Sequence, residues 1–267
     1  MLLPIRAPGT QSPLFCIHPA IGLSWCYGGL AQHLDSHRPV YGLQSPALTE
    51  TLDESTSIED LAARYAREIR TVQPDGLYHL LGWSLGGLIA HAVAIEMQRT
   101  GQEVALLAMM DSYVLTDHAM AAADPTPAEL LGEFGIELPA TDGDFDELTA
   151  EEVAELLRAV SSPFGYLTPR QLERIYEDYL HATERAQGYR PAIYHGDLLF
   201  FSARVEKFDP KRTASAWRPF VSGTITDYPV EFAHADMTTA GALASIGPVL
   251  DDRLRNAPSA AMELILT

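Results

Sequence analysis

The segment 77–99, LYHLLGWSLGGLIAHAVAIEMQR, constrains the fold of this chain more than any other. It begins with a short apolar run over 77–81 and continues, after a tight turn, as an apolar-rich helical pattern without proline. The turn contains Gly82, Ser84 and Gly86 in a G-x-S-x-G spacing between a strand and a helix. Such a turn strains its central residue, and a Cβ two positions before or after it would collide with the adjoining strand or helix. The segment therefore predicts an exposed, strained serine at a strand-to-helix turn.

Ser84 is the candidate nucleophile of the chain. The turn places it at the N-terminus of a helix, where unpaired N–H groups and partial positive charge favour a negatively charged oxygen. We therefore expect the backbone N–H of Leu85 to donate a hydrogen bond to an oxyanion that forms beside the serine. The alternative is a glycine-rich turn without a catalytic role, because five-residue patterns also occur by chance.

The composition limits the partners and the compartment. The chain has 267 residues, which suits one large α/β domain, and a formal net charge of −18. This acidity argues against nucleic acid and anionic membranes as partners, since both require a basic surface. No segment has the apolar length of a membrane span, and the N-terminus lacks a signal-peptide pattern. Cys16 and Cys26 have no metal-site companions, so we expect a reducing cytoplasmic compartment and no metal or bound cofactor. Cys16 lies in an apolar run, so we expect its thiol to be buried.

Short apolar strands alternate with helical patterns along most of the chain. Strand patterns occupy 13–17, 40–43, 77–81, 102–110, 196–203 and 223–232. Helical patterns occupy 23–34, 57–72, 85–99 and 242–254. Ser57 begins the second helix as an N-cap residue, with Asp60 three positions later, whereas residues 1–12 read as an irregular lead-in. The alternation predicts an α/β fold with a mostly parallel central sheet flanked by helices.

The pattern changes over 115–188, a segment that we call the lid. It has no clear buried strand but has helical patterns at 127–134, 149–160 and 168–187. Thr149 with Glu152 forms a capping box, and Thr168 precedes a proline suited to the first helical position. Carboxylates crowd its middle and predict a solvated face: Asp142, Asp144, Asp146, Glu147, Glu151, Glu152 and Glu155. We expect a single domain over 1–267, with a core of 1–114 and 189–254, a helical lid over the site, and a tail of 255–267.

A sheet with this serine turn and a helical insertion predicts the α/β-hydrolase fold, in which the serine is followed along the chain by an acid and then a histidine. His234 is the candidate base because it follows the last strand pattern and precedes the last helix. Asp111 is the candidate acid because it ends the strand after the serine's helix, at the edge where catalytic groups gather. Glu206 and Asp209, which follow strand 196–203, are the alternatives.

The loop after the first strand pattern supplies the second expected oxyanion donor. In this fold the donor is a backbone N–H of such a loop, here that of Ala20 or Ile21. His18 lies in the same loop, too early in the chain for the base of this fold, so we expect a structural role for it.

These residues predict acyl transfer. His234 would take the proton of Ser84, while Asp111 fixes the imidazole tautomer and stabilises the imidazolium. Ser84 would attack an acyl carbonyl, and the acyl-enzyme would pass its acyl group to water or to another nucleophile.

The sequence resembles the type I thioesterase domains that end nonribosomal peptide synthetases and related polyketide synthases. The resemblance covers nearly the whole chain and rests on the segments 13–34, 40–46, 78–94, 106–113, 194–203 and 217–234. The order His18-Pro19-Ala20 is similar to that of the in-line terminal domains, and the family's acid position supports Asp111. Ile21 stands where the family often has glycine, which narrows the backbone options of the loop.

The resemblance implies a substrate and a partner. The substrate would be a peptidyl or acyl chain carried as a phosphopantetheine thioester on a carrier domain just upstream, and release would occur by hydrolysis or macrocyclisation. No carrier serine motif precedes Pro13, so we expect a monomeric domain taken from a longer polypeptide. The alternatives are a stand-alone editing thioesterase that clears misloaded carriers, a non-catalytic hydrolase-fold binding module, and a generic esterase or lipase.

Overall fold

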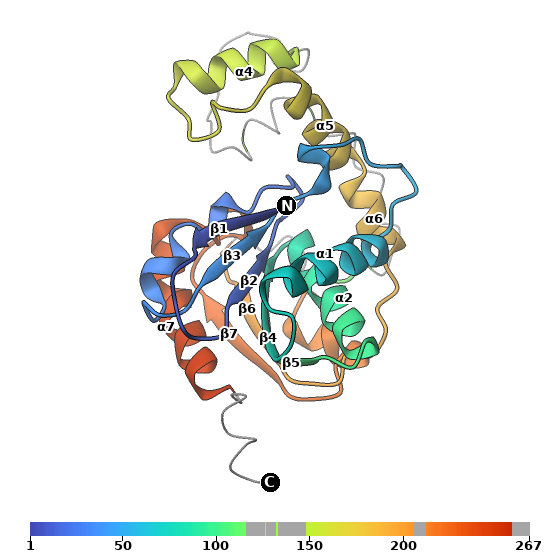
Figure 1. The fold of residues 1–267 in the computed structure, drawn as a ribbon, viewed down its shortest axis with the longest axis vertical. Coiled ribbons are helices and arrows are strands. Elements are labelled where there is room, and N and C mark those ends of the chain that lie inside the picture. Colours follow the sequence, from blue (N-terminus) through green and yellow to red (C-terminus); the bar gives the residue numbers. More distant parts are fainter. Residues whose placement is uncertain (116–125, 127–131, 133–147, 206–211, 258–267) are drawn as a thin grey trace.

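The computed structural model describes residues 1–115, 126, 132, 148–205 and 212–257. Within them the strands form one seven-stranded sheet in the order β1-β3-β2-β4-β5-β6-β7 (Figure 1). The strands are β1 (Leu2–Arg6), β2 (Leu14–Ile17), β3 (Val40–Leu43), β4 (Leu77–Trp83), β5 (Glu103–Met110), β6 (Leu198–Ala203) and β7 (Ile225–Val230). Neighbouring strands are parallel except for β1 with β3. The predicted mostly parallel sheet is confirmed, and the C-terminal ends of its parallel strands share one edge.

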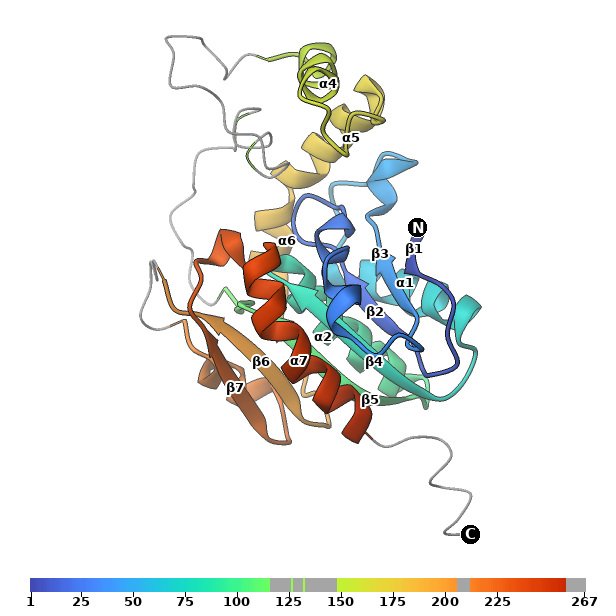
Figure 2. The same ribbon diagram turned by 90° about the vertical axis from the view of Figure 1, so that its left-hand side faces the viewer.

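Helices cover both faces of this sheet. α1 (Ile58–Val72) and α2 (Leu85–Arg99) lie together on one face, and α7 (Ala240–Asn256) lies on the other, as Figures 1 and 2 show. The sheet is therefore the middle layer of three, which is the arrangement expected for parallel strands joined by helical crossovers.

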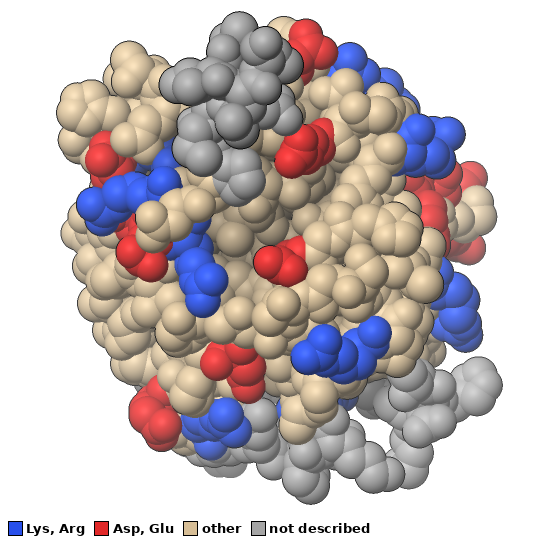
Figure 3. Space-filling view, turned by 90° about the horizontal axis from the view of Figure 1, so that it is seen from below, with Lys and Arg blue, Asp and Glu red and all other residues tan. Residues whose placement is uncertain are grey.

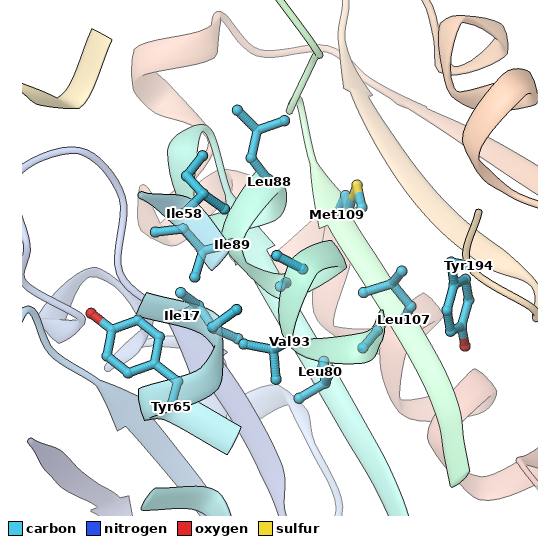
Figure 4. Packing of buried hydrophobic residues seen from close by; sticks show 14 of the residues in the cluster. Ile17, Ile58, Tyr65, Leu80, Leu88, Ile89, Val93, Leu107, Met109 and Tyr194 are labelled. Carbon is cyan, nitrogen blue, oxygen red and sulfur yellow. The ribbon is translucent and has the colours of Figure 1, made fainter. Parts of the chain in front are cut away.

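The central strand β4 is buried along its whole length, and its alternate side chains enter two separate cores. Tyr78 and Leu80 pack with α1 and α2, whereas Leu81 and Trp83 pack on the side of α7. The first core is drawn in Figure 4, where the labelled side chains are Ile17, Ile58, Tyr65, Leu80, Leu88, Ile89, Val93, Leu107, Met109 and Tyr194. Burial on both faces explains why this strand reads as a continuous apolar run rather than as an alternation.

The described part of the lid projects beyond the edge of the sheet where the parallel strands end (Figures 1 and 2). Its described helices are α4 (Ala150–Ala159), α5 (Pro169–Leu180) and α6 (Ala182–Gly188). The helix predicted over 168–187 is thus two helices, which meet at His181. The helix predicted over 127–134 falls outside the described residues except for Gly132.

Helices α1, α4 and α5 each begin with a capping box, in which the N-cap side chain and the side chain three residues later bond each other's backbone N–H. The Ser57 hydroxyl accepts from the backbone N–H of Asp60 at 3.1 Å, and the Asp60 carboxylate accepts from the N–H of Ser57 at 3.0 Å. Equivalent reciprocal pairs start α4 at Thr149 and α5 at Thr168. Each pair satisfies N–H groups that a helix start leaves without a partner.

Two predictions about the N-terminal part were wrong. Residues 1–12 were expected to be irregular, yet they contain β1, whose proline, Pro4, is tolerated because β1 is an edge strand. The helix expected over 23–34 is instead two short 3-10 helices, Trp25–Tyr27 and Leu30–His33. The pair Gly28-Gly29 separates them, and glycine is a poor helix former, so the apolar pattern alone did not sustain an α-helix.

The surface carries charges of both signs. On the face opposite the lid, basic and acidic side chains are interspersed among uncharged ones (Figure 3). On α4, the predicted solvated face is seen at Glu151, Glu152 and Glu155, which are exposed; the four carboxylates of 142–147 lie outside the described residues. Among the described helices, none is long and apolar enough to cross a membrane.

His91 lies in the middle of α2 and is fully buried. Its Nδ1 accepts from the Tyr189 hydroxyl at 2.8 Å, and its Nε2 donates to the Phe220 carbonyl oxygen at 3.1 Å. The Trp217 ring lies 4.9 Å away, centroid to centroid. Burial lowers the pKa of His91 to about 4, and the hydrogen bond to Phe220 opposes this only in part.

The first prediction concerns the packing of α2 on β4. Gly82→Ala would place a Cβ 2.1 Å from the Gly86 carbonyl oxygen, so we expect a loss of at least about 2 kcal/mol in the free energy of unfolding, measured by urea denaturation. Gly188→Ala is the control, because a Cβ there meets nothing within 4 Å. Equal stability of Gly82→Ala and the wild type would contradict the close approach of α2 to β4.

The second prediction concerns acid stability. His91 stays neutral in the folded state, whereas the unfolded chain binds a proton below pH 6.5, so its contribution is lost as the pH falls from about 6.5 to about 4. We expect this group to account for about 2 kcal/mol of the fall in unfolding free energy between pH 7 and pH 5. His91→Gln should therefore show a shallower pH dependence than the wild type. His195→Gln, at an exposed side chain, should keep the wild-type dependence; equal slopes for all three proteins would refute the assignment.

Candidate active site

Ser84 occupies a strained turn between β4 and α2. Its φ of 55° lies in the left-handed region, and its N–H donates to the Met110 carbonyl oxygen at 3.1 Å. A Cβ on Gly86 would lie 2.5 Å from the Ile17 carbonyl oxygen, and one on Gly82 would meet the Gly86 backbone. The two glycines therefore let α2 start directly against the ends of β4 and β2, which confirms the steric reason predicted for their spacing.

The three residues proposed for catalysis from sequence lie in one hydrogen-bonded row. His234 Nε2 lies 3.1 Å from Ser84 Oγ, and His234 Nδ1 lies 2.8 Å from Asp111 Oδ2. Ser84 follows β4, Asp111 follows β5, and His234 follows β7 in a short 3-10 helix, His234–Asp236. The sheet therefore gathers at one edge groups that are up to 150 residues apart.

The electrostatics of Asp111 fix the histidine tautomer. Burial alone would raise the pKa of Asp111, but hydrogen bonds from His234, Tyr113 and the Ala203 N–H outweigh it and hold that pKa below its ordinary value. The carboxylate is therefore ionised at neutral pH and accepts the Nδ1 proton of His234. Nε2 is then left as the acceptor that faces Ser84.

Tyr113 and Ala203 support the carboxylate, and the sequence reasoning missed both. The Tyr113 hydroxyl donates to Asp111 Oδ1 at 2.8 Å, and the Ala203 N–H donates to the same oxygen at 2.9 Å. A tyrosine two residues after the candidate acid was a readable signal; the backbone donor from β6 was not, because strand register is absent from a single sequence. Asp111 itself has a φ of 43°, a second strained position beside that of Ser84.

The expected oxyanion donors come from two segments of the chain, the start of α2 and the loop after β2. Leu85 is the first residue of α2, so its N–H has no acceptor within the helix and is available beside Ser84. Ala20 and Leu85 both line the cavity at the serine. The side chain of Ile21, in contrast, is buried among apolar residues of α4 and α5, away from the cavity lining.

A cavity of about 300 Å³ opens above the row of three residues. Its walls come from the core and from α6, and it is lined by Ala20, Ser84, Leu85, Leu88, Asp111, Tyr113, Leu115, Ala182, Thr183, Ala186, Gln187, Arg212 and His234. The lining is apolar near α2 and includes hydroxyl, amide and guanidinium groups elsewhere. An acyl chain attached to Ser84 would therefore meet both kinds of surface.

A buried polar network ties the lid to the loop that carries Ala20 and Ile21. Asp178 of α5 forms a buried ion pair with Arg185 of α6, and it accepts from the Ser45 hydroxyl at 2.6 Å. The N–H of Ser45 in turn donates to the Gly22 carbonyl oxygen at 2.8 Å. The loop is thus held by the lid through this network and through the side chain of Ile21.

His18 is buried and hydrogen-bonded, as expected for a structural histidine. Its Nδ1 donates to the Pro19 carbonyl oxygen at 2.7 Å, and its Nε2 accepts from the Tyr65 hydroxyl at 2.5 Å. Burial lowers its pKa. Both ring nitrogens are therefore engaged by the protein, and neither faces Ser84.

Among the described residues, no other candidate forms a competing centre. Glu206 and Asp209, the alternative acids, lie outside the described residues. Cys16 is buried, as predicted, and burial raises the pKa of its thiol. Within 1–115, 148–205 and 212–257, no group of three or more His, Cys, Asp or Glu side chains is arranged to hold a metal ion.

The fold and this geometry define the chain as an α/β-hydrolase in which helices α4, α5 and α6 come between β5 and β6. The sequence matches the family model described as a thioesterase domain over residues 12–246. The chain therefore belongs to the thioesterase domain family, and it resembles the terminal thioesterase domains of nonribosomal peptide synthetases.

Named relatives are consistent with this assignment. The chain is 38% identical over 263 residues to a dimodular nonribosomal peptide synthase of Bacillus subtilis, which covers 95% of this chain but 11% of the relative. The solved structure of the Vlm2 thioesterase domain matches with a TM-score of 0.75 at 23% identity, covering 94% of this chain and 97% of that one. A four-domain nonribosomal peptide synthetase solved with AMP and glycine matches with a TM-score of 0.80 at 23% identity, covering 96% of this chain and 20% of that one. The structural likenesses support the fold, and the chain spans about a tenth of its Bacillus relative.

Proposed function

We propose that the chain releases a peptidyl or related acyl chain from a carrier domain through an ester on Ser84. The observation that carries this proposal is the row Ser84–His234–Asp111, with spacings of 3.1 and 2.8 Å, in the lining of a cavity that α6 also borders. Family membership supports thioester chemistry, and the row supplies a nucleophile, a base and an orienting acid.

Each residue has a separate role in the proposed mechanism. His234 Nε2 removes the proton of Ser84 as its oxygen attacks the thioester carbonyl, and later returns that proton to the leaving thiol. Asp111 keeps the Nδ1 proton in place and stabilises the imidazolium that forms in between. The same base then activates the group that attacks the acyl-Ser84 ester.

The charge that develops on the carbonyl oxygen needs fixed donors. The N–H of Leu85 is one proposed donor, and a backbone N–H of the Ala20–Ile21 loop is the other. Losing one such donor in related chemistry costs about 2.7–4 kcal/mol of transition-state stabilisation. The choice of this loop is supported by Ala20, which lines the same cavity as Ser84.

The proposed partner is a carrier domain of the same assembly. The relatives are multidomain synthetases in which this domain is a small part, so the acyl group would arrive on a phosphopantetheine arm rather than as a free acid. The final nucleophile is water or a group of the acyl chain itself, which would give a linear or a cyclic product.

The third prediction tests the site residues. Ser84→Ala should abolish thioester turnover, and Asp111→Asn should lower kcat by about 10³-fold or more, because the imidazole loses its fixed tautomer. Glu206→Gln is the matched control, and we expect its kcat to stay within about threefold of the wild type. Unfolding midpoints of all variants would show that the fold is kept. Equal losses in Asp111→Asn and Glu206→Gln would contradict the assignment of the acid.

The same assay separates the proposed substrate from its alternatives. We would compare one peptide as a carrier-bound thioester and as a simple ethyl ester, and would compare both with an acetyl-loaded carrier. The proposal expects the highest kcat/KM for the carrier-bound peptide. Preference for the acetyl-loaded carrier would indicate an editing enzyme, and equal use of carrier-bound thioester and free ester would indicate a generic esterase.

A further inference from the structure

The two oxygens of the Asp111 carboxylate have different partners. Oδ2 faces His234 Nδ1 at 2.8 Å, whereas Oδ1 accepts from the Tyr113 hydroxyl at 2.8 Å and from the Ala203 N–H at 2.9 Å. A carboxylate can rotate about its terminal torsion, since that torsion is broad. The donors on Oδ1 oppose this rotation and keep Oδ2 directed at the imidazole.

Tyr113 is well suited to this task. Its ring packs against Phe200 of β6, with centroids 5.4 Å apart. This packing fixes the position of the hydroxyl beside Asp111. Burial, together with the neighbouring Asp111 carboxylate, raises the pKa of the phenol. The hydroxyl therefore stays protonated over any practical assay range and remains a donor to the carboxylate.

The other charges near Tyr113 do not replace this interaction. Asp227 of β7 raises the pKa of the phenol and Arg204, after β6, lowers it. These two side chains carry opposite charges and form an ion pair at 3.7 Å. Their effects on the pKa of Tyr113 therefore oppose each other. The carboxylate of Asp111 is thus the group to which the phenol is directly coupled.

We propose that Tyr113 is a positioning residue for the candidate triad, acting through Asp111 Oδ1 rather than on the substrate. This inference rests on the proposed function, because the Tyr113 hydroxyl can affect the reaction rate through Asp111 only if His234 is the base. Its hydroxyl sets both the orientation and the charge distribution of the carboxylate that holds the imidazole. Tyr113 also lines the cavity, so the test must separate the hydroxyl's effect on Asp111 from any contact with the acyl chain.

The fourth prediction uses Tyr113→Phe, which removes the hydroxyl and keeps the ring on Phe200. We expect kcat for a peptidyl pantetheine thioester to fall about tenfold with KM nearly unchanged, since Ala203 still holds Oδ1. Without the phenol, negative charge concentrates on the carboxylate and strengthens its attraction for the imidazolium. The acidic limb of kcat/KM should therefore move to higher pH.

A double-mutant cycle isolates the route of the effect. In an Asp111→Ala background the hydroxyl has no carboxylate to hold, so adding Tyr113→Phe should change kcat/KM by less than about twofold. Tyr78→Phe is the control, because its hydroxyl donates to the Gln73 carbonyl oxygen at 2.9 Å at the far end of β4. The same tenfold loss in both backgrounds, or a Tyr113→Phe rate and pH profile equal to the wild type, would overturn the inference.

A second readout does not need turnover. The proton between His234 Nδ1 and Asp111 should give a low-field NMR resonance in the resting protein, and Tyr113→Phe should move it further downfield while Tyr78→Phe leaves it in place. An unmoved resonance would overturn the inference even if the wild type hydrolysed nothing. Absence of wild-type turnover with a shifted resonance would instead count against the proposed function alone.

Discussion

The close approach of α2 to β4 and β2 is the constraint on which the rest of the site depends. It exists because Gly82 and Gly86 have no Cβ, so backbone meets backbone at distances that no other residue permits. This contact forces Ser84 into its left-handed conformation and directs its hydroxyl out of the sheet. It also sets Leu85 at the start of α2, beside the serine, where its N–H is unpaired.

Around that turn, the parallel sheet brings the three candidate catalytic residues together. β5 and β7 end at the same edge as β4, so that His234, which follows β7, contacts both Ser84 and Asp111, the residue that follows β5. The strain at Ser84 and Asp111 is held by buried strands on either side. Such strain is commonly found where catalytic groups must be fixed before the substrate arrives.

The lid and the proposed oxyanion loop are one connected unit in this structure. Ile21 packs into the lid core, and Asp178 reaches the Gly22 backbone through Ser45. A branched side chain at 21 is therefore used for packing against the lid rather than for narrowing the cavity. The sequence alone indicates only that Ile21 narrows the backbone options of its loop, because the direction of a loop side chain cannot be read from one sequence.

Patterns tied to backbone sterics and chain order could be read from the sequence. The serine turn, the capping pair at Ser57 and the alternation of strands with helices each depend on local chemistry, and the structure has them as predicted. The order of serine, acid and histidine selected the three residues that the structure brings together. What could not be read were features set by tertiary context: β1 at the sheet edge, the 3-10 turns around Gly28, and the donors to Asp111 Oδ1.

The central claim is that Ser84 forms an ester with the acyl chain. The most direct test is intact-mass spectrometry of the full chain after brief incubation with a peptidyl pantetheine thioester, followed by peptide mapping. The account predicts a mass increase equal to one acyl group, located on Ser84, in the wild type and none in Ser84→Ala. A folded wild-type protein that turns over the thioester without such an adduct in rapidly quenched samples, or an adduct on another residue such as Cys26, would contradict it.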